Sequence, residues 1–448
     1  MDGLRRLRRA APRVDRAVNL LLSIDVIDGP VLAILGTLSI ALVIYLLLRG
    51  RDAEWFVTAG AAMLVGALVG CGLLWIVNVG GLLGGPADRG VWFWAPAGFA
   101  AIGLAVVNLW HARWWRVVVA VVAILVFTLT TFLGVNAVYG IGRTLAAFLH
   151  VSTASPVAIP SVVPTPGAST TPLYQRWKPP KDMPAHGTVG LVPGGIPNTA
   201  SGFDARPAQI YLPPAALVAD PPELPLVIMM MGQPGDPDAS YIGDVLDDYQ
   251  AQHDGLAPIA LVVDQLGDPF TDPLCLNTER GQVETYVMTD VVGWARSHLN
   301  IQQGRDAWTV AGYSNGGACA AYFGSKHPDV FGNLLDVSGV EYPGAETSSI
   351  VLDQIFDGDQ SAFDAVKPAS IMRATGDYPD TVAVFTMGQY DEEFRPGYER
   401  LWPVAKAAGM RVTHKLIIGA GHGLEALDGG LDEGFRVLYP RLGLDAGE

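Results

Sequence analysis

The first 150 residues contain four long runs of apolar side chains, and polar residues are confined to the short stretches between them. The runs cover Gly29–Leu48, Trp55–Val79, Val91–Leu109 and Val117–Tyr139. Each has close to the ~20 residues that a helix needs to cross the hydrocarbon core of a bilayer. A helix in a soluble core would be shorter and more often interrupted. The pattern therefore predicts a four-helix transmembrane domain over residues 29–150, after a basic N-terminal tail over residues 1–28.

Details of these runs favour an anchor rather than an ion or substrate path. Trp55, Trp92 and Trp114 stand near the ends of runs, where the aromatic belts of a membrane protein lie. Gly66 and Gly70 form a G-x-x-x-G step, which allows two helices to pack closely. No carboxylate lies in the middle of a run, whereas a buried one would mark a transport function.

From Gly187 onward the pattern changes to short apolar runs that alternate with amphipathic stretches. The runs expected to form strands are Thr188–Leu191, Ala208–Leu212, Leu226–Met231, Ile259–Val263, Trp308–Gly312, Asn333–Val337, Val382–Met387 and Val412–Ile418. The later ones are apolar throughout, as strands of a buried parallel sheet are. Helices are expected over Tyr241–His253, Val283–His298, Ala318–His327 and Pro396–Ala408. This alternation predicts an α/β domain over residues 187–448 with a mostly parallel sheet of eight strands.

Residues 151–186 are expected to link the two domains. Up to Tyr174 the segment is uncharged and rich in Pro, Ser, Thr and Ala, a composition typical of an extended tether. Arginines in the N-terminal tail would place both termini in the cytoplasm by the positive-inside rule, whereas the basic first and third loops would place them outside. The linker suits an exported domain. We therefore expect the C-terminal domain to be extracytoplasmic.

The net charge changes sign between the two expected domains. Residues 1–150 carry a net charge of +5 and the rest −20, which gives −15 for the whole chain. So acidic a domain is a poor partner for nucleic acid and other polyanions. It would suit a cationic substrate, although solubility alone also explains the acidity.

A short motif, G-Y-S-N-G-G at residues 312–317, lies between an expected strand and an expected helix. This is the context of a nucleophile elbow, in which a serine on a sharp strand-to-helix turn needs small neighbours. Gly312 and Gly316 supply that space. Such a turn lifts the hydroxyl of Ser314 above the edge of the sheet and points backbone N–H groups at a developing oxyanion. Ser314 is therefore the candidate nucleophile.

Two later loops supply partners for this serine. The expected strand Val382–Met387 is followed by an acidic loop in which Asp391 is the preferred acid and Glu392 the alternative. The last expected strand is followed by Gly421-His422-Gly423, and His422 is the candidate base. All three groups follow carboxyl ends of strands, where parallel sheets carry their sites. An exposed acidic loop and a structural histidine are the alternative interpretations.

Donors for an oxyanion hole are expected from the backbone N–H groups of Asn315 and Gln233. Asn315 directly follows the serine, and Gln233 lies in the Met-Gly-Gln-Pro-Gly turn after Leu226–Met231. A plain Gly-Pro turn is the alternative for the second. Asp264, Asp268 and Asp272 lie after another strand and are candidate contacts for a cationic group of the substrate.

The chain has three cysteines, and their spacing does not suggest a metal site. Cys71 lies in the second apolar run. Cys275 and Cys319 could form a disulfide in an oxidising compartment or remain two buried thiols. No cofactor and no metal are expected.

The order Ser314, Asp391, His422 is that of the nucleophile, acid and base of α/β-hydrolases. With the His327-Pro328-Asp329-Val330-Phe331 and Gly421-His422-Gly423 segments, residues 187–442 resemble an esterase family of that fold. The family includes esterase-D-type enzymes, enterochelin-esterase-like proteins and mycobacterial mycolyltransferases. The resemblance implies an α/β-hydrolase fold and acyl-ester chemistry. The four-span anchor departs from ordinary members, and Met231 stands where many esterases have an acidic residue or a histidine.

The expected function is that of a membrane-anchored serine esterase acting through an acyl-enzyme. Because the bilayer holds the domain near envelope lipids, the expected substrate is an acyl ester, or an aminoacyl ester, of such a lipid or a related metabolite. One alternative is a mycolyltransferase-like acyltransferase that moves acyl groups between envelope lipids or sugars. Another is a non-catalytic membrane scaffold with an inactive hydrolase domain.

Overall fold

The computed structural model describes residues 21–22, 24–27, 29–50, 52–79, 87, 89–110, 112–139, 142, 144–148, 154–160, 162, 171–268 and 271–447. The chain separates into two compact units, Met1–Thr153 and Ala154–Glu448. The six arginines of the expected basic tail lie outside the described residues, as do residues 163–170 of the expected linker.

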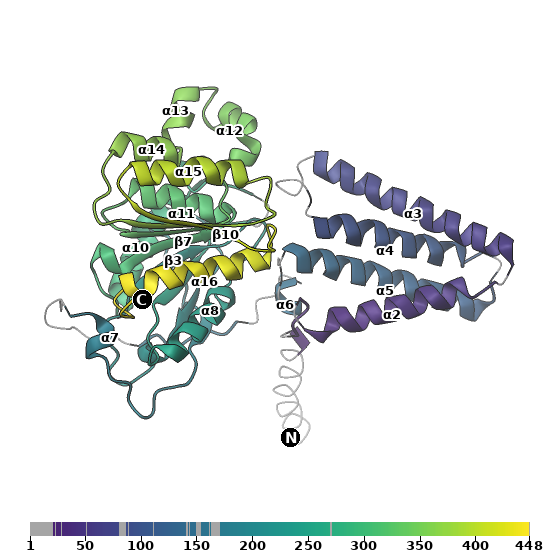
Figure 1. Ribbon diagram of the computed structural model, residues 1–448, viewed down its shortest axis with the longest axis horizontal. Helices are drawn as coiled ribbons and strands as arrows, with labels where there is room; N and C mark the ends of the chain where they lie inside the picture. Colours follow the sequence, from purple (N-terminus) through teal and green to yellow (C-terminus); the bar gives the residue numbers. More distant parts are fainter. Residues whose placement is uncertain are drawn as a thin grey trace, which may run out of the picture. The chain divides into compact units, whose positions relative to one another are not determined.

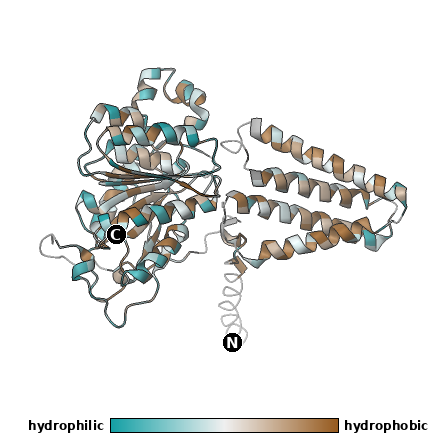
Figure 2. Ribbon diagram, viewed as in Figure 1, coloured by the Kyte–Doolittle hydropathy of each residue, from teal (hydrophilic) through white to brown (hydrophobic). Residues whose placement is uncertain are grey.

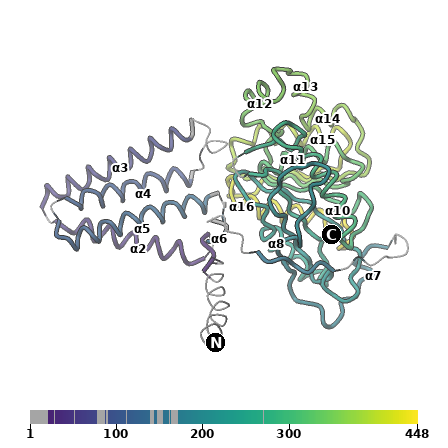
Figure 3. Tube along the Cα trace, turned by 180° about the vertical axis from the view of Figure 1, so that it is seen from behind, coloured from purple at the N-terminus to yellow at the C-terminus, as the bar shows by residue number. Residues whose placement is uncertain are grey.

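The first unit consists of α2 (Pro30–Leu47), α3 (Ala53–Val79), α4 (Arg89–Val107), α5 (Trp114–Tyr139) and the short α6 (Leu145–Phe148). In this unit α3 packs on α4, α4 on α5, and α5 on α2 (Figures 1 and 3). Glycines allow the closest of these contacts, since a Cβ atom on Gly66 would lie 2.2 Å from the carbonyl oxygen of Phe99.

The four long helices are apolar around their whole circumference rather than along one stripe (Figure 2). Leu68, Trp75 and Phe132 are among the large apolar side chains that remain exposed. Helices of this kind are found in membranes or in the centre of large cores. By length and composition, all four could cross a membrane, as the apolar pattern predicts.

The second unit is built on a sheet with the strand order β1-β2-β4-β3-β7-β8-β9-β10. Its strands are β1 (Thr188–Leu191), β2 (Gln209–Leu212), β3 (Leu226–Met230), β4 (Ile259–Val263), β7 (Trp308–Tyr313), β8 (Asn333–Val337), β9 (Val382–Gly388) and β10 (Arg411–Ile417). β2 pairs antiparallel with β1 and with β4, and all other pairs are parallel. This is the α/β-hydrolase arrangement, so the expected fold is confirmed. A separate hairpin pairs β5 (Asn277–Thr278) with β6 (Gly281–Gln282).

Helices cover both faces of this sheet (Figure 1). On one face lie α8 (Ser240–Gln252) and α16 (Leu424–Arg441), and on the other α11 (Asn315–Lys326), α14 (Pro368–Thr375) and α15 (Arg395–Ala407). The remaining helices are α7 (Leu173–Arg176), α9 (Val283–Thr285), α10 (Val292–His298), α12 (Ser348–Ile355) and α13 (Gln360–Ala365). Strands β3, β4, β7, β8 and β9 are buried along their whole length, which explains their continuous apolar runs.

Two helical regions differ from the sequence-based prediction. The helix expected over Val283–His298 contains a π-helical segment at Tyr286–Val291. Helix α16 was not predicted, because its glycines weaken the helical pattern. Packing requires those glycines: a Cβ atom on Gly430 would lie 2.5 Å from side-chain atoms of Val337 and Thr386. Contact with the sheet therefore outweighs the low helix propensity of α16.

Two parts of the expected tether pack on the second unit. The amide of Val157 donates to the carbonyl oxygen of Leu191 at the end of β1, at 3.1 Å. Leu173 is buried, and the amide of Tyr174 donates to the carbonyl oxygen of Gly443. These few apolar residues anchor a segment whose overall composition resembles a linker, so the compact unit begins at Ala154.

Candidate active site

Ser314 occupies a sharp turn between β7 and α11. Its backbone has φ 56° and ψ −119°. Residues other than glycine rarely adopt this conformation, which is often found at functional sites. The neighbouring glycines are obligatory: a Cβ atom on Gly312 would lie 1.8 Å from the carbonyl oxygen of Gly316, and one on Gly316 would lie 2.1 Å from that of Met230. The motif thus forms a nucleophile elbow.

Three side chains that are far apart in the sequence form one hydrogen-bonded series. Ser314 Oγ lies 2.8 Å from His422 Nε2, and His422 Nδ1 lies 2.6 Å from Asp391 Oδ2. Asp391 is 4% exposed, so its carboxylate interacts with the imidazole away from bulk water. The structure therefore brings together the three residues that the sequence singled out as nucleophile, base and acid.

Between the two candidate acids, the geometry selects Asp391. Its side chain faces the imidazole, whereas Glu392 lies exposed one residue later. Glu393 is the third carboxyl group of this loop. Partial desolvation raises the pKa of Glu393 to about 7, while His422 lowers it and Asp391 raises it.

Two aromatic residues that sequence reasoning missed hold the histidine. The ring of Tyr313 stacks on that of His422 with centroids 5.6 Å apart, and its hydroxyl donates to the His422 carbonyl oxygen at 3.0 Å. Phe394 lies on the imidazole with a centroid distance of 4.6 Å. Tyr313 is the residue before the nucleophile and Phe394 follows Asp391 by three positions, so their closeness to the motif residues was the available signal.

The loop after β3 lies beside the elbow, as the oxyanion-hole prediction requires. A Cβ atom on Gly232 would be 3.2 Å from Ser314 Cβ, which places Gln233 one residue from that contact. Asn315 begins α11 directly after the nucleophile. Both backbone amides thus belong to segments that lie at the nucleophile. Both therefore remain candidates for stabilising an oxyanion.

The three aspartates expected to contact a cationic substrate differ in how closely the protein surrounds them. Asp264 is 1% exposed, pairs with the guanidinium of Arg206 at 2.6 Å, and also accepts the backbone amides of Arg206, Leu266 and Gly267. It has no room for a ligand, so that expectation is wrong for Asp264.

Asp272 lies close to the elbow but also has protein partners. It accepts the amide of Leu274 at 2.8 Å and also interacts with the side chain of Asn315. Desolvation raises the pKa of Asp272 despite these bonds. Asp268 is exposed on the preceding loop, where Thr271 contacts it. A substrate contact stays a prediction for Asp268 and Asp272.

Cys275 and Cys319 form a disulfide with their Cα atoms 5.5 Å apart. Cys319 lies in the second turn of α11, so the bridge fastens the loop that carries Asp272 to the helix of the elbow. In the part of the chain that the structure describes, no group of His, Cys, Asp and Glu side chains is arranged to hold a metal ion.

The fold and this hydrogen-bonded series define a class of protein: the second unit is an α/β-hydrolase domain of the serine ester hydrolase type. Residues 204–413 match the family model described as "Putative esterase". An uncharacterized protein of Corynebacterium glutamicum is 32% identical over 281 residues, which cover 60% of this chain and 66% of that protein. The chain thus spans slightly less than two thirds of the length of that relative.

Solved structures similar to this chain include an S-formylglutathione hydrolase from Agrobacterium tumefaciens. It is 16% identical, with a TM-score of 0.45, and the match covers 58% of this chain and 98% of that one. The fluorophosphonate-binding serine hydrolase F of Staphylococcus aureus is 13% identical, with a TM-score of 0.44, over 56% of this chain and 98% of that one.

Proposed function

We propose that this protein is a membrane-anchored serine esterase that hydrolyses an acyl ester of a cell-envelope lipid, or of a related metabolite, through an acyl-enzyme. The observation that carries the proposal is the series from Ser314 Oγ through His422 to Asp391, with distances of 2.8 and 2.6 Å. A serine hydroxyl is a weak nucleophile at neutral pH and needs an adjacent base.

In this mechanism, His422 Nε2 takes the proton of Ser314 as Oγ attacks the ester carbonyl carbon. Asp391 holds the imidazole in the required tautomer and stabilises the imidazolium. The Asn315 and Gln233 amides stabilise the tetrahedral oxyanion. His422 then gives its proton to the leaving alcohol, and the acyl group stays on Ser314 until a water molecule, activated by the same imidazole, releases it.

Two observations support a lipid substrate on the outer side of the membrane. Four helices of suitable length and composition would keep the hydrolase unit near bilayer lipids, which raises their effective concentration. The Cys275–Cys319 disulfide supports an oxidising, extracytoplasmic location, since such bonds are rare in the cytosol. An aminoacylated lipid remains one version of the substrate, through Asp268 or Asp272.

A fluorophosphonate probe tests the chemistry, because it reacts covalently with an activated serine. Detergent-solubilised full-length protein should be labelled and should hydrolyse p-nitrophenyl butyrate, whereas Ser314→Ala should do neither. Equal labelling of both proteins would refute the proposal and favour an inactive scaffold. Lipid analysis of cells that carry the wild-type protein or Ser314→Ala would then identify the ester, and appearance of the acyl group on another hydroxyl would show transfer rather than hydrolysis.

A further inference from the structure

One buried side chain connects the two segments that carry the candidate oxyanion donors. Gln265 follows β4 by two residues and is 2% exposed. Its Nε2 donates to the carbonyl oxygen of Met231 at 2.6 Å and to Asn315 Oδ1 at 3.0 Å. Met231 precedes Gly232-Gln233, and Asn315 follows Ser314. The single amide group of Gln265 is therefore hydrogen-bonded to both segments that carry the candidate oxyanion donors.

The amide chemistry of Gln265 fits this position closely. An –NH₂ group carries two hydrogens and can donate to two acceptors at once. Both acceptors here are carbonyl-type oxygens. A carboxylate in place of the amide would place its own lone pairs against theirs and would repel them. A buried acceptor that loses its donor also carries a desolvation penalty. Glutamine therefore satisfies two buried oxygens and fixes their separation.

The bond to Gln265 also sets the orientation of the Asn315 side chain. With Oδ1 facing Gln265, the –NH₂ group of Asn315 is left free to interact with the Asp272 carboxylate. The loop of Asp272 is closed onto α11 by the Cys275–Cys319 disulfide. Hydrogen bonds thus connect the Met231 carbonyl oxygen through Gln265 to the side chain of Asn315.

The backbone beneath Gln265 is itself held in place. Asp264, the preceding residue, accepts the amides of Leu266 and Gly267 at 3.1 and 2.9 Å and pairs with Arg206. These bonds fix the turn on both sides of Gln265. The glutamine side chain therefore extends from a rigid base, as a group that defines a distance must.

We propose that Gln265 is a positioning residue that sets the spacing and orientation of the Gln233 and Asn315 amides in the oxyanion hole. This inference rests on the proposed esterase function. Oxyanion donors act only when they lie at hydrogen-bond distance from the position of the developing charge. A small displacement of either segment should therefore weaken binding of the transition state more than binding of the ester.

Two nearly isosteric variants test this role in the full-length protein in detergent: Gln265→Met, which donates nothing, and Gln265→Glu, which brings acceptors against acceptors. With p-nitrophenyl butyrate we expect kcat to fall about 10- to 100-fold and KM to change less than about 3-fold, since loss of a whole oxyanion donor costs ~10²–10³ in kcat. A trifluoromethyl ketone, which forms an oxyanion on Ser314, should bind more weakly by a similar factor.

Gln250 offers a matched control. It is 3% exposed on α8 and donates from Nε2 to the carbonyl oxygen of Ala185 at 3.0 Å, so Gln250→Met removes a comparable buried hydrogen bond far along the chain from the motif. It should lower the midpoint of thermal unfolding without changing kcat or the affinity for the ketone.

The inference is overturned if either Gln265 variant keeps kcat within 3-fold of the wild type, or if kcat falls while the affinity for the ketone stays constant. Equal kcat losses in the Gln250 and Gln265 variants would also overturn it, because the effect would then be general. The Ser314→Ala protein separates this failure from that of the proposed function: an active wild type beside an inactive Ser314→Ala leaves the esterase intact even if Gln265 has no role.

Discussion

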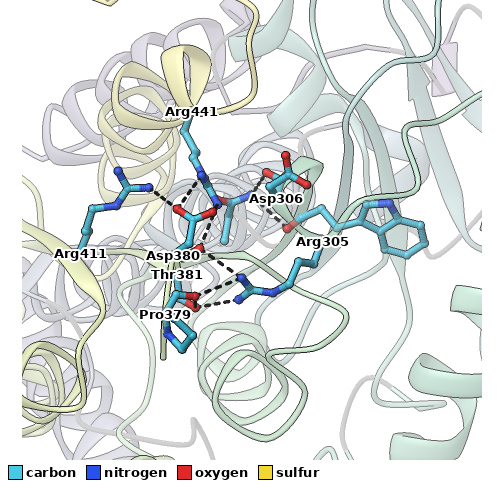
Figure 4. A network of polar contacts seen from close by, with 9 residues as sticks. Arg305, Asp306, Pro379, Asp380, Thr381, Arg411 and Arg441 are labelled. Carbon is cyan, nitrogen blue, oxygen red and sulfur yellow. Dashed lines mark hydrogen bonds and ion pairs between the residues drawn. The ribbon is translucent and has the colours of Figure 1, made fainter. Parts of the chain in front are cut away.

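The two ends of the parallel strands in the central sheet differ in their polar contacts. We call them the carboxyl edge and the amino edge of the sheet. At the carboxyl edge, strands β7, β9 and β10 end at the Ser314, Asp391 and His422 series. At the amino edge, the starts of β7, β8, β9 and β10 meet a network of three arginines around Asp380 (Figure 4). The same strands therefore present chemistry at one end and ion pairing at the other.

At the amino edge, Asp380 and its neighbours receive hydrogen bonds from three arginines. Arg441 donates to both carboxylate oxygens of Asp380 and to Asn333, Arg411 pairs with the same carboxylate, and Arg305 donates to the carbonyl oxygens of Pro379 and Asp380 (Figure 4). These bonds tie the strand starts to α16. The arrangement serves stability, since charge-assisted hydrogen bonds are stronger than neutral ones.

The carboxyl edge retains features that cost stability. Ser314 and Ser338 have positive φ angles of 56° and 47°. Asp336, 4% exposed at the end of β8, has an oxygen without a hydrogen-bond partner among the described residues. Strain and unsatisfied buried groups persist where the rest of the fold supports them, and they gather at functional sites. Asp380 at the amino edge also has a positive φ, of 48°, so backbone strain does not separate the two edges. They differ in their carboxyl groups: Asp336 is buried with an unpartnered oxygen, whereas Asp380 is exposed and paired with arginines.

Removing one carboxylate from the carboxyl edge should have the largest effect. In Asp391→Asn the side-chain –NH₂ would face His422 Nδ1 and favour the tautomer that cannot accept the proton of Ser314. We expect kcat at neutral pH to fall about 10⁴-fold, with little change in the midpoint of thermal unfolding. Steady-state hydrolysis of p-nitrophenyl butyrate measures this. Glu392→Gln is the control and should keep its activity; a loss below 10-fold in Asp391→Asn would contradict the assignment.

Much of this edge could be predicted from the sequence, because each feature depends on local pattern. Buried strands produce continuous apolar runs, and glycines around Ser314 and His422 mark the turns. Gln265 was not predictable in this way. Its role depends on β4 lying beside β3 in the sheet order, which brings residues 265, 231 and 315 together, and no local pattern encodes that neighbourhood. The amino-edge network was not predictable for the same reason, since only tertiary structure brings Arg305 and Arg441 to Asp380.

The buried carboxyl group of Asp336 at the carboxyl edge should lower the stability of the folded protein in a pH-dependent way. The expected effect is intermediate in size among the three predictions. Burial raises the pKa of Asp336 from 3.8 to about 7, although the Gly339 amide lowers it. Because the folded protein then binds this proton more tightly than the unfolded chain, stability falls as pH rises from about 4 to about 7 and is constant above. At 1.36 kcal/mol per pKa unit, the cost is at most about 4 kcal/mol.

Asp336→Asn should remove this dependence. We expect the variant to unfold at a higher temperature than the wild type at pH 8, with an advantage that shrinks toward pH 4. Thermal unfolding of both proteins across this range gives the difference directly, and groups common to both cancel. A difference that does not vary with pH would show that the carboxyl of Asp336 does not titrate between the two values.

The smallest effect should come from the amino edge, through Asp380→Asn. Asparagine tolerates the positive φ of 48° at this position, so the change removes charge while keeping the backbone. The side chain is 59% exposed, and exposed pairs contribute only ~0.2–1 kcal/mol each, while Arg305 and Arg441 keep their bonds to the backbone oxygen of residue 380. We expect stability to fall by about 1 kcal/mol, less at high salt because of screening, and kcat to stay within 2-fold of the wild type. A salt-independent loss, or a large loss of kcat, would mean that the two edges are coupled rather than separate.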